Sequence, residues 1–133
     1  MKRLDDKVQV SGQVRPEEVA GLGVAMLINN RPDDEEPGQP TSAEVEAAAR
    51  AAGVEYRHIP AVVGAMSLPQ IAQMQDALAA ADGPVHAFCK SGTRSTFLWA
   101  LARAKMGDDA EELVAKAAAA GYDLTPIRAY LAP

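Results

Sequence analysis

Residues 86–97 have the sequence HAFCKSGTRSTF, in which a short apolar stretch ends at Cys89, the only cysteine of the 133-residue chain. Four small or basic residues separate Cys89 from Arg94, and the segment 95–106 that follows is apolar on nearly all sides. This order predicts a buried strand, a short loop and a buried helix. Because open parallel sheets bind ligands at the carboxyl ends of their strands, the loop with Cys89 is the first candidate for a functional site.

The remainder of the chain alternates between short apolar runs and longer helical patterns. Strands are expected at 8–10, 24–29, 54–60 and 85–88, and helices at 17–23, 42–52, 67–83, 95–106, 108–121 and 125–133. A segment rich in proline and acid, 30–40, is expected to be a loop. Strands separated by helices imply right-handed crossovers, so we predict a three-layer α/β sandwich with a mainly parallel sheet of four or five strands. At this length a single domain over residues 1–133 is expected.

The composition excludes several classes of function. Apolar residues make up 48% of the chain, which is typical of a soluble globular protein, and a formal net charge of −5 argues against a nucleic-acid or anionic membrane surface. The N-terminus lacks the apolar core of a signal peptide and no run is long enough to span a membrane, so a cytoplasmic protein is expected. One cysteine and two histidines cannot form a disulfide or a structural zinc site, and no metal or cofactor is expected.

The residues between Cys89 and Arg94 have the properties of an anion-binding loop. Backbone N–H groups of a strand–loop–helix turn can converge on an anion, and the helix N-terminus adds partial positive charge. Gly92 permits backbone angles that other residues resist, and the small Ser91 and Thr93 leave the centre of the turn open. Arg94 is expected to close the ring with a planar, bidentate cation.

The same loop predicts that Cys89 is a nucleophile. Helix N-termini and neighbouring cations such as Lys90 and Arg94 stabilise cysteine thiolates, and the thiolate is the reactive form. Ser95 is a candidate to donate a hydrogen bond to the sulfur, and Lys90 to attract an anionic substrate. A lone cysteine after an apolar strand is most often a small buried hydrophobe, but an inert cysteine does not require an anion-binding loop beside it.

Other polar residues follow or occupy the predicted strands. Arg31 is a candidate second contact for the anion, and its alternative role is to tether the loop. The acidic run 33–36 is expected to be a solvated loop, with a substitute proton donor as the alternative. His58 and His86 are expected to have structural roles, because nothing near them in the sequence indicates a metal site or a catalytic triad.

The stretch GPVHAFCKSGTRS at 83–95 contains a motif, CKSGTRS, that resembles the active-site loop of the protein tyrosine phosphatase and rhodanese group. Together with SGQ at 11–13, INNRPD at 28–33 and AAGVEYRHIP at 51–60, it makes nearly the whole chain similar to one bacterial family. That family is the β-lactamase hydrolase-like, phosphatase-like sulfurtransferase domain, often fused to or encoded beside a metallo-β-lactamase-like persulfide dioxygenase. The resemblance implies a dual-specificity phosphatase type of fold, a small anionic substrate and a persulfide dioxygenase as partner.

The resemblance implies two chemistries, with Cys89 as nucleophile and Arg94 as anion clamp in both. Phosphatase loops of the group have five residues between Cys and Arg, whereas this chain has four, which is the rhodanese spacing. These phosphatases also carry a general-acid Asp after a strand like 54–60, and the segment 61–70 contains no acid. We therefore favour a sulfurtransferase that moves sulfane sulfur from thiosulfate or a persulfide through a Cys89 persulfide. The alternatives are a phosphatase with a Cys89 phosphocysteine and a non-catalytic anion-binding domain.

Overall fold

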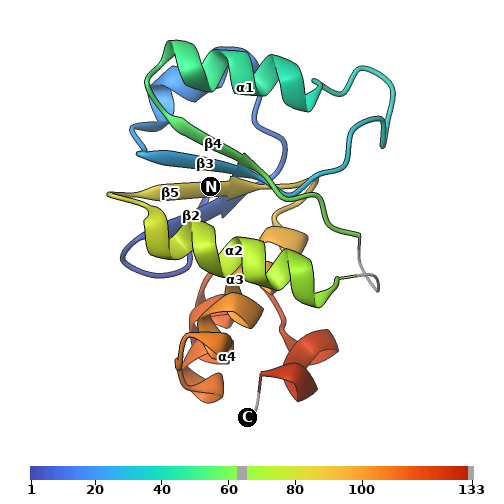
Figure 1. Ribbon diagram of the computed structural model, residues 1–133. Helices are drawn as coiled ribbons and strands as arrows, with labels where there is room; N and C mark the ends of the chain where they lie inside the picture. Colours follow the sequence, from blue (N-terminus) through green and yellow to red (C-terminus); the bar gives the residue numbers. More distant parts are fainter. Residues whose placement is uncertain (63–65, 132–133) are drawn as a thin grey trace.

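A five-stranded sheet forms the centre of the computed structural model, which describes residues 1–62 and 66–131 (Figure 1). The strands are β1 (Lys2–Arg3), β2 (Val8–Ser11), β3 (Met26–Asn29), β4 (Glu55–His58) and β5 (Val85–Phe88), in the spatial order β1-β2-β5-β3-β4. The four strands from β2 to β4 in this order are parallel, and β1 pairs antiparallel with β2. The mainly parallel sheet is confirmed; the two-residue β1 was not predicted.

Helices cover both faces of the sheet. One face carries η1 (Pro16–Leu22) and α1 (Ser42–Ala51), and the other carries α2 (Leu68–Ala80), α3 (Thr93–Lys105), α4 (Ala110–Ala119) and η2 (Thr125–Tyr130) (Figure 1). Each face has its own buried apolar cluster, so the strands are covered on both sides as their apolar runs predict. The predicted three-layer α/β fold is therefore confirmed.

The helix after the cysteine loop is the most deeply placed of the helices. Every residue of α3 from Arg94 to Ala102 is buried, in agreement with the prediction from its apolar sequence. The helix begins at Thr93, two residues earlier than expected, which places Arg94 in its first turn. The start of the helix and the end of β5 together fix the short loop that carries Cys89.

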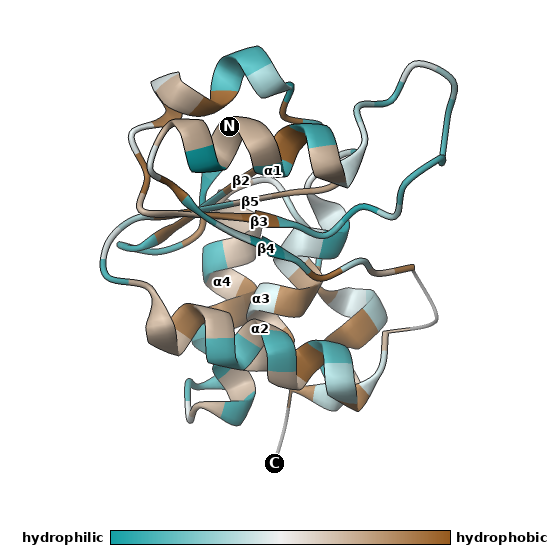
Figure 2. Cartoon of the chain, turned by 45° about the horizontal axis from the view of Figure 1, so that its top comes forward, coloured by the Kyte–Doolittle hydropathy of each residue, from teal (hydrophilic) through white to brown (hydrophobic). Residues whose placement is uncertain are grey.

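Hydrophilic residues concentrate on the outer faces of the helices and on the long loop between β3 and α1 (Figure 2). Within the described parts of the chain, no helix has both the length and the apolar character needed to cross a lipid bilayer. The loop between β3 and α1 leaves the sheet on the side toward which the parallel strands point (Figure 1).

The carboxyl ends of the four parallel strands bring four chain segments to one edge of the sheet. Gly12 follows β2, Arg31 follows β3, Ala61 follows β4 and Cys89 follows β5. Strand ends of an open parallel sheet form the usual ligand crevice, and this topology makes the neighbours of the Cys89 loop come from all four strands.

His86 links two of the central strands. Its ring lies in β5 with 1% exposure, and its two nitrogens contact the side chains of Gln9 (2.9 Å) and Ser11 (2.7 Å) on β2. Burial lowers the pKa of His86 to about 4, so the ring is neutral at physiological pH. These contacts give His86 a structural role, as predicted.

The buried His86 predicts a loss of stability in mild acid. In the unfolded chain His86 takes up a proton near the ordinary histidine pKa of about 6.5, whereas in the folded protein it takes up the proton only near pH 4. The free energy of unfolding should therefore fall by up to about 3 kcal/mol between these pH values. Urea unfolding measured from pH 7 to pH 4 should show a smaller fall for His86→Gln. Equal pH slopes in wild type and His86→Gln would contradict the prediction.

Candidate active site

The loop after β5 folds its backbone around the sulfur of Cys89. The Gly92 N–H donates to Cys89 Sγ at 3.1 Å, and Gly92 is the N-terminal cap of α3 with a φ of +92°, a left-handed angle that favours glycine. The first N–H groups of a helix have no partner within it, so those of Thr93 and Arg94 are available to a ligand. This arrangement places one backbone donor beside the sulfur, and the binding of an anion by the loop stays a prediction.

Tyr122, from the segment between α4 and η2, supports the loop from outside. Its hydroxyl donates to the Ser91 carbonyl at 3.0 Å and lies so close to Gly92 that a Cβ there would collide with it. Burial raises the pKa of Tyr122 and the nearby Cys89 sulfur raises it further, so the hydroxyl remains a donor at neutral pH. Nothing in the sequence indicates this role of Tyr122, because it lies 31 residues beyond Ser91.

Gly12 supports the loop from the opposite side. A Cβ at Gly12 would lie 2.8 Å from the Lys90 carbonyl oxygen, so only glycine allows the β2 end to approach the loop this closely. The Ser11 carbonyl also accepts from the Cys89 N–H at 3.4 Å. Contacts from both sides hold the loop in one conformation.

Arg94 places its guanidinium between the loop and the segment after β4. It donates to the Ala61 carbonyl at 2.9 Å. The Glu35 carboxylate raises the pKa of Arg94 most, and Cys89 contributes further. The structure thus places Arg94 next to the Cys89 loop, and its role as an anion clamp stays a prediction.

Arg31 brings a second guanidinium to the same place. Its side chain is 1% exposed, and its Nε donates at 2.8 Å to Glu35 Oε1, the oxygen that also accepts from Arg94 at 2.9 Å. Arg94 forms a further bond, at 2.7 Å, to Glu35 Oε2. Arg31 and Arg94 therefore converge on a single carboxylate group, which makes Arg31 a neighbour of the Cys89 loop.

Glu35 differs from the expectation of a solvated acidic run. Residues 33–38 are exposed as predicted, but the Glu35 carboxylate is turned inward and its side chain is only 26% exposed. Hydrogen bonds from Arg94 and Arg31 lower its pKa to about 2. An ionised carboxylate has no proton to give at neutral pH, so Glu35 is not a substitute acid in this conformation.

Two further side chains complete the charge pattern. Glu36 pairs with Arg31 at 3.1 Å and with Lys90 at 3.9 Å, and Gln13 Oε1 accepts from Arg31 at 3.0 Å. Lys90 is exposed at the rim of the loop, where its predicted role of attracting anions is sterically possible. The site thus holds three cations that all face acidic residues of one loop.

Two details of the predicted loop are wrong. Cys89 has no exposed surface, whereas an open sulfur was expected. Ser95 does not bond to it: among the described residues the buried Ser95 hydroxyl has no hydrogen-bond partner. The hydroxyl of Ser91 instead donates within the loop, to Thr93 at 3.1 Å.

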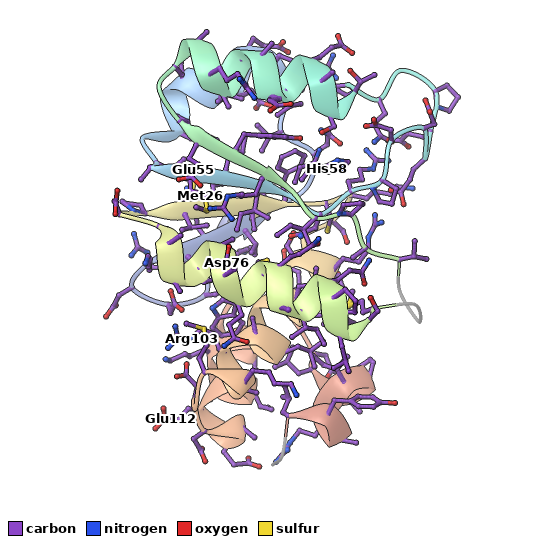
Figure 3. All side chains as sticks on the ribbon, viewed as in Figure 1. Met26, Glu55, His58, Asp76, Arg103 and Glu112 are labelled. Atoms are coloured by element: carbon purple, nitrogen blue, oxygen red, sulfur yellow. The ribbon has the colours of Figure 1, made fainter. Side chains whose placement is uncertain are left out.

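The remaining predicted candidates lie at the margin of the site. His58 ends β4 close to the base of the β3–α1 loop, where its Nε2 contacts the Arg31 carbonyl at 3.0 Å, so it positions backbone rather than substrate (Figure 3). The segment 61–70 passes Arg94 and carries no acidic residue in the sequence; its residues 63–65 lie outside the described part of the chain.

The contact between Gly92 and Tyr122 yields a stability prediction. Gly107 has a similar φ of +105° but open space around it, so Gly107→Ala should cost only the left-handed strain of about 1 kcal/mol. Gly92→Ala adds the collision with Tyr122 and should cost at least about 1 kcal/mol more. Urea unfolding of both variants measures the difference. The double variant Gly92→Ala/Tyr122→Phe should recover most of this additional cost. Equal losses of stability in Gly92→Ala and Gly107→Ala would refute the contact.

Comparison with known proteins places this geometry in a family. Residues 1–106 match the family model described as the beta-lactamase hydrolase-like protein, phosphatase-like domain. A beta-lactamase hydrolase-like protein from Xylella fastidiosa is 37% identical over 125 residues, which are 91% of this chain but 29% of the relative. The chain therefore spans less than a third of the length of that curated relative.

Solved structures share the fold. A candidate phosphatase from Neisseria meningitidis has a TM-score of 0.83 and 32% identity, with 98% of this chain and 94% of that one covered. TpbA from P. aeruginosa has a TM-score of 0.66 and 21% identity, with 97% and 80% covered. The fold is that of the tyrosine and dual-specificity phosphatases, and the chain belongs to the family of beta-lactamase hydrolase-like proteins, as their phosphatase-like domain.

Proposed function

We propose that this domain hydrolyses phosphate monoesters with Cys89 as the nucleophile. The observation that carries the proposal is the Gly92 N–H that donates to the Cys89 sulfur at the end of a parallel strand, with Arg94 in the first turn of the helix that follows. Membership of a phosphatase-like family and the likeness to phosphatase folds support phosphoryl transfer better than the sulfur transfer that the loop spacing favours.

In the proposed reaction the Cys89 thiolate attacks phosphorus as the bond to the ester oxygen breaks. The leaving group departs with the electron pair and takes a proton from water, while Arg94 and the loop N–H groups hold the phosphoryl oxygens. Water then attacks the phosphocysteine, which releases inorganic phosphate and a proton and restores the thiolate. Arg31 serves as a second contact for the oxyanion.

A structural neighbour supports a small anionic substrate. TpbA was crystallised in complex with pTyr, a phosphate monoester on an aromatic ring. Aryl phosphates also suit a site without a side chain that can donate a proton to the leaving group. Segment 61–70 has no acidic residue, and Glu35 is ionised. Without a proton donor, esters whose leaving groups are stable as anions should react fastest.

Hydrolysis of an aryl phosphate tests the proposal. Release of nitrophenol from p-nitrophenyl phosphate should disappear in Cys89→Ser and fall about 10²–10³-fold in Arg94→Lys, because lysine cannot make the bidentate contact. Arg103→Lys is the matched control: it lies on the same helix and pairs with Asp108 far along it, so the rate should stay unchanged. Equal activity of wild type and Cys89→Ser would contradict the proposal.

A second candidate function is sulfur transfer, with the persulfide dioxygenase implied by the resemblance as a partner. It is favoured by the four-residue spacing from Cys89 to Arg94 and by the absence of an acid in 61–70. The Cys89 thiolate would attack the outer sulfur of thiosulfate, and sulfite would leave with the electron pair of the broken S–S bond. An acceptor thiolate would then take the sulfur and release Cys89.

Intact mass measurement separates the two candidates. If sulfur transfer is the function, incubation with thiosulfate should add one sulfur atom to the wild-type protein and none to Cys89→Ser. The phosphatase proposal predicts an unchanged mass together with phosphate release from the aryl ester. A protein that takes up no sulfur, hydrolyses no ester and still binds phosphate would be the non-catalytic anion-binding domain.

A further inference from the structure

Two consecutive residues of the β3–α1 loop, Glu35 and Glu36, cover the cations of the candidate active site. Glu35 accepts hydrogen bonds of 2.7–2.9 Å from Arg94 and Arg31. Glu36 pairs with Arg31 at 3.1 Å and with Lys90 at 3.9 Å. Two carboxylates thus neutralise the same cations that are the candidates to bind a substrate oxyanion.

The guanidinium groups are held by other protein groups besides these carboxylates. Arg94 donates to the Ala61 carbonyl at 2.9 Å, and Arg31 donates to Gln13 Oε1 at 3.0 Å. The stem of Arg31 is also almost fully buried, which leaves it little freedom to move. The cation pair is therefore a preformed anion site that does not depend on Glu35 for its position.

The loop that carries the glutamates is closed on itself. The Gln39 side chain donates to the Pro32 carbonyl at 2.8 Å and accepts from the Glu35 N–H at 3.0 Å. Residues 33–38 are exposed, so no buried apolar side chain anchors this part of the loop. Release of the segment breaks its ion pairs, which a bound anion would replace, while the bond from the Ser42 N–H to Asp33 Oδ1 at 2.8 Å can remain as a hinge at α1.

We propose that Glu35 and Glu36 are a built-in competitor for the anion site, and that substrate binding displaces them together with their loop. This inference rests on the proposed function, because it takes the Cys89 loop as the substrate site. The pair carries two negative charges, so a ligand that replaces both and leaves the local charge unchanged is a dianion. Phosphate monoesters and thiosulfate share this charge and oxyanion chemistry.

Calorimetric titration with inorganic phosphate tests the competition. Glu35→Gln removes the competing charge with little change of shape and should bind phosphate about tenfold more tightly than wild type. Asp34→Asn is the matched control, because it removes one charge from the same exposed loop and asparagine tolerates the φ of +62° at this position. Its affinity should change by less than about twofold. Unchanged or weaker binding by Glu35→Gln would overturn the proposal.

Hydrogen exchange of the wild-type protein gives a readout that needs no variant. Phosphate should speed exchange of the backbone amides at 32–39, where the loop is released, and slow it at 89–94, where the ligand binds. Slower exchange in both segments would mean that the loop closes over the ligand, and the proposal would be wrong.

Binding of anions with different charges tests whether the site prefers a dianion. Wild type should bind sulfate more tightly than nitrate, and equal affinities would contradict a dianion site. Separate titrations with phosphate and thiosulfate identify which dianion the site prefers. Tighter phosphate binding by Glu35→Gln without ester hydrolysis by wild type would uphold the competitor and reject the phosphatase. Ester hydrolysis without tighter binding would reject the competitor alone.

Discussion

Arg31 and Arg94 carry guanidinium groups with little access to water. The need to pair these two charges determines the arrangement of the polar groups at this end of the molecule. A buried charge is costly unless it is paired, and the counter-charge here comes from Glu35 on a surface loop. The core therefore fixes the cations, while the loop supplies their partner. Because the cations belong to the core and the carboxylate to a surface loop, another anion can replace the Glu35 carboxylate without disturbing the sheet.

Much of the fold follows from the sequence because its signals are local. Short apolar runs bounded by turn residues mark the parallel strands, and the nearly all-apolar segment after Cys89 marks the buried α3. Parallel strands bring their carboxyl ends together, so Arg31 and Cys89 are expected at one edge although 58 positions separate them. The two-residue β1 is too short to leave such a signal.

The parts of the site that escape prediction depend on side-chain contacts between distant segments. Four consecutive acids in a proline-rich loop have no periodicity, so nothing in the sequence indicates that Glu35 turns inward to meet Arg94, 59 residues away. Loop spacing and family membership also point to different chemistry, since the four-residue gap after Cys89 favours sulfur transfer while the relatives are phosphatase-like. The absence of exposed surface at Cys89 depends in the same way on the packing of its neighbours, which the sequence does not specify.

The hydroxyl of Tyr122 has a consequence for where the domain ends. Similarity to the family model stops at residue 106, yet Tyr122 reaches back to the Ser91 carbonyl and packs over Gly92. The part of the chain that shapes the Cys89 loop thus extends beyond the region that the family model matches. A chain that ended at residue 106 would therefore lack the hydroxyl that supports the Cys89 loop from outside.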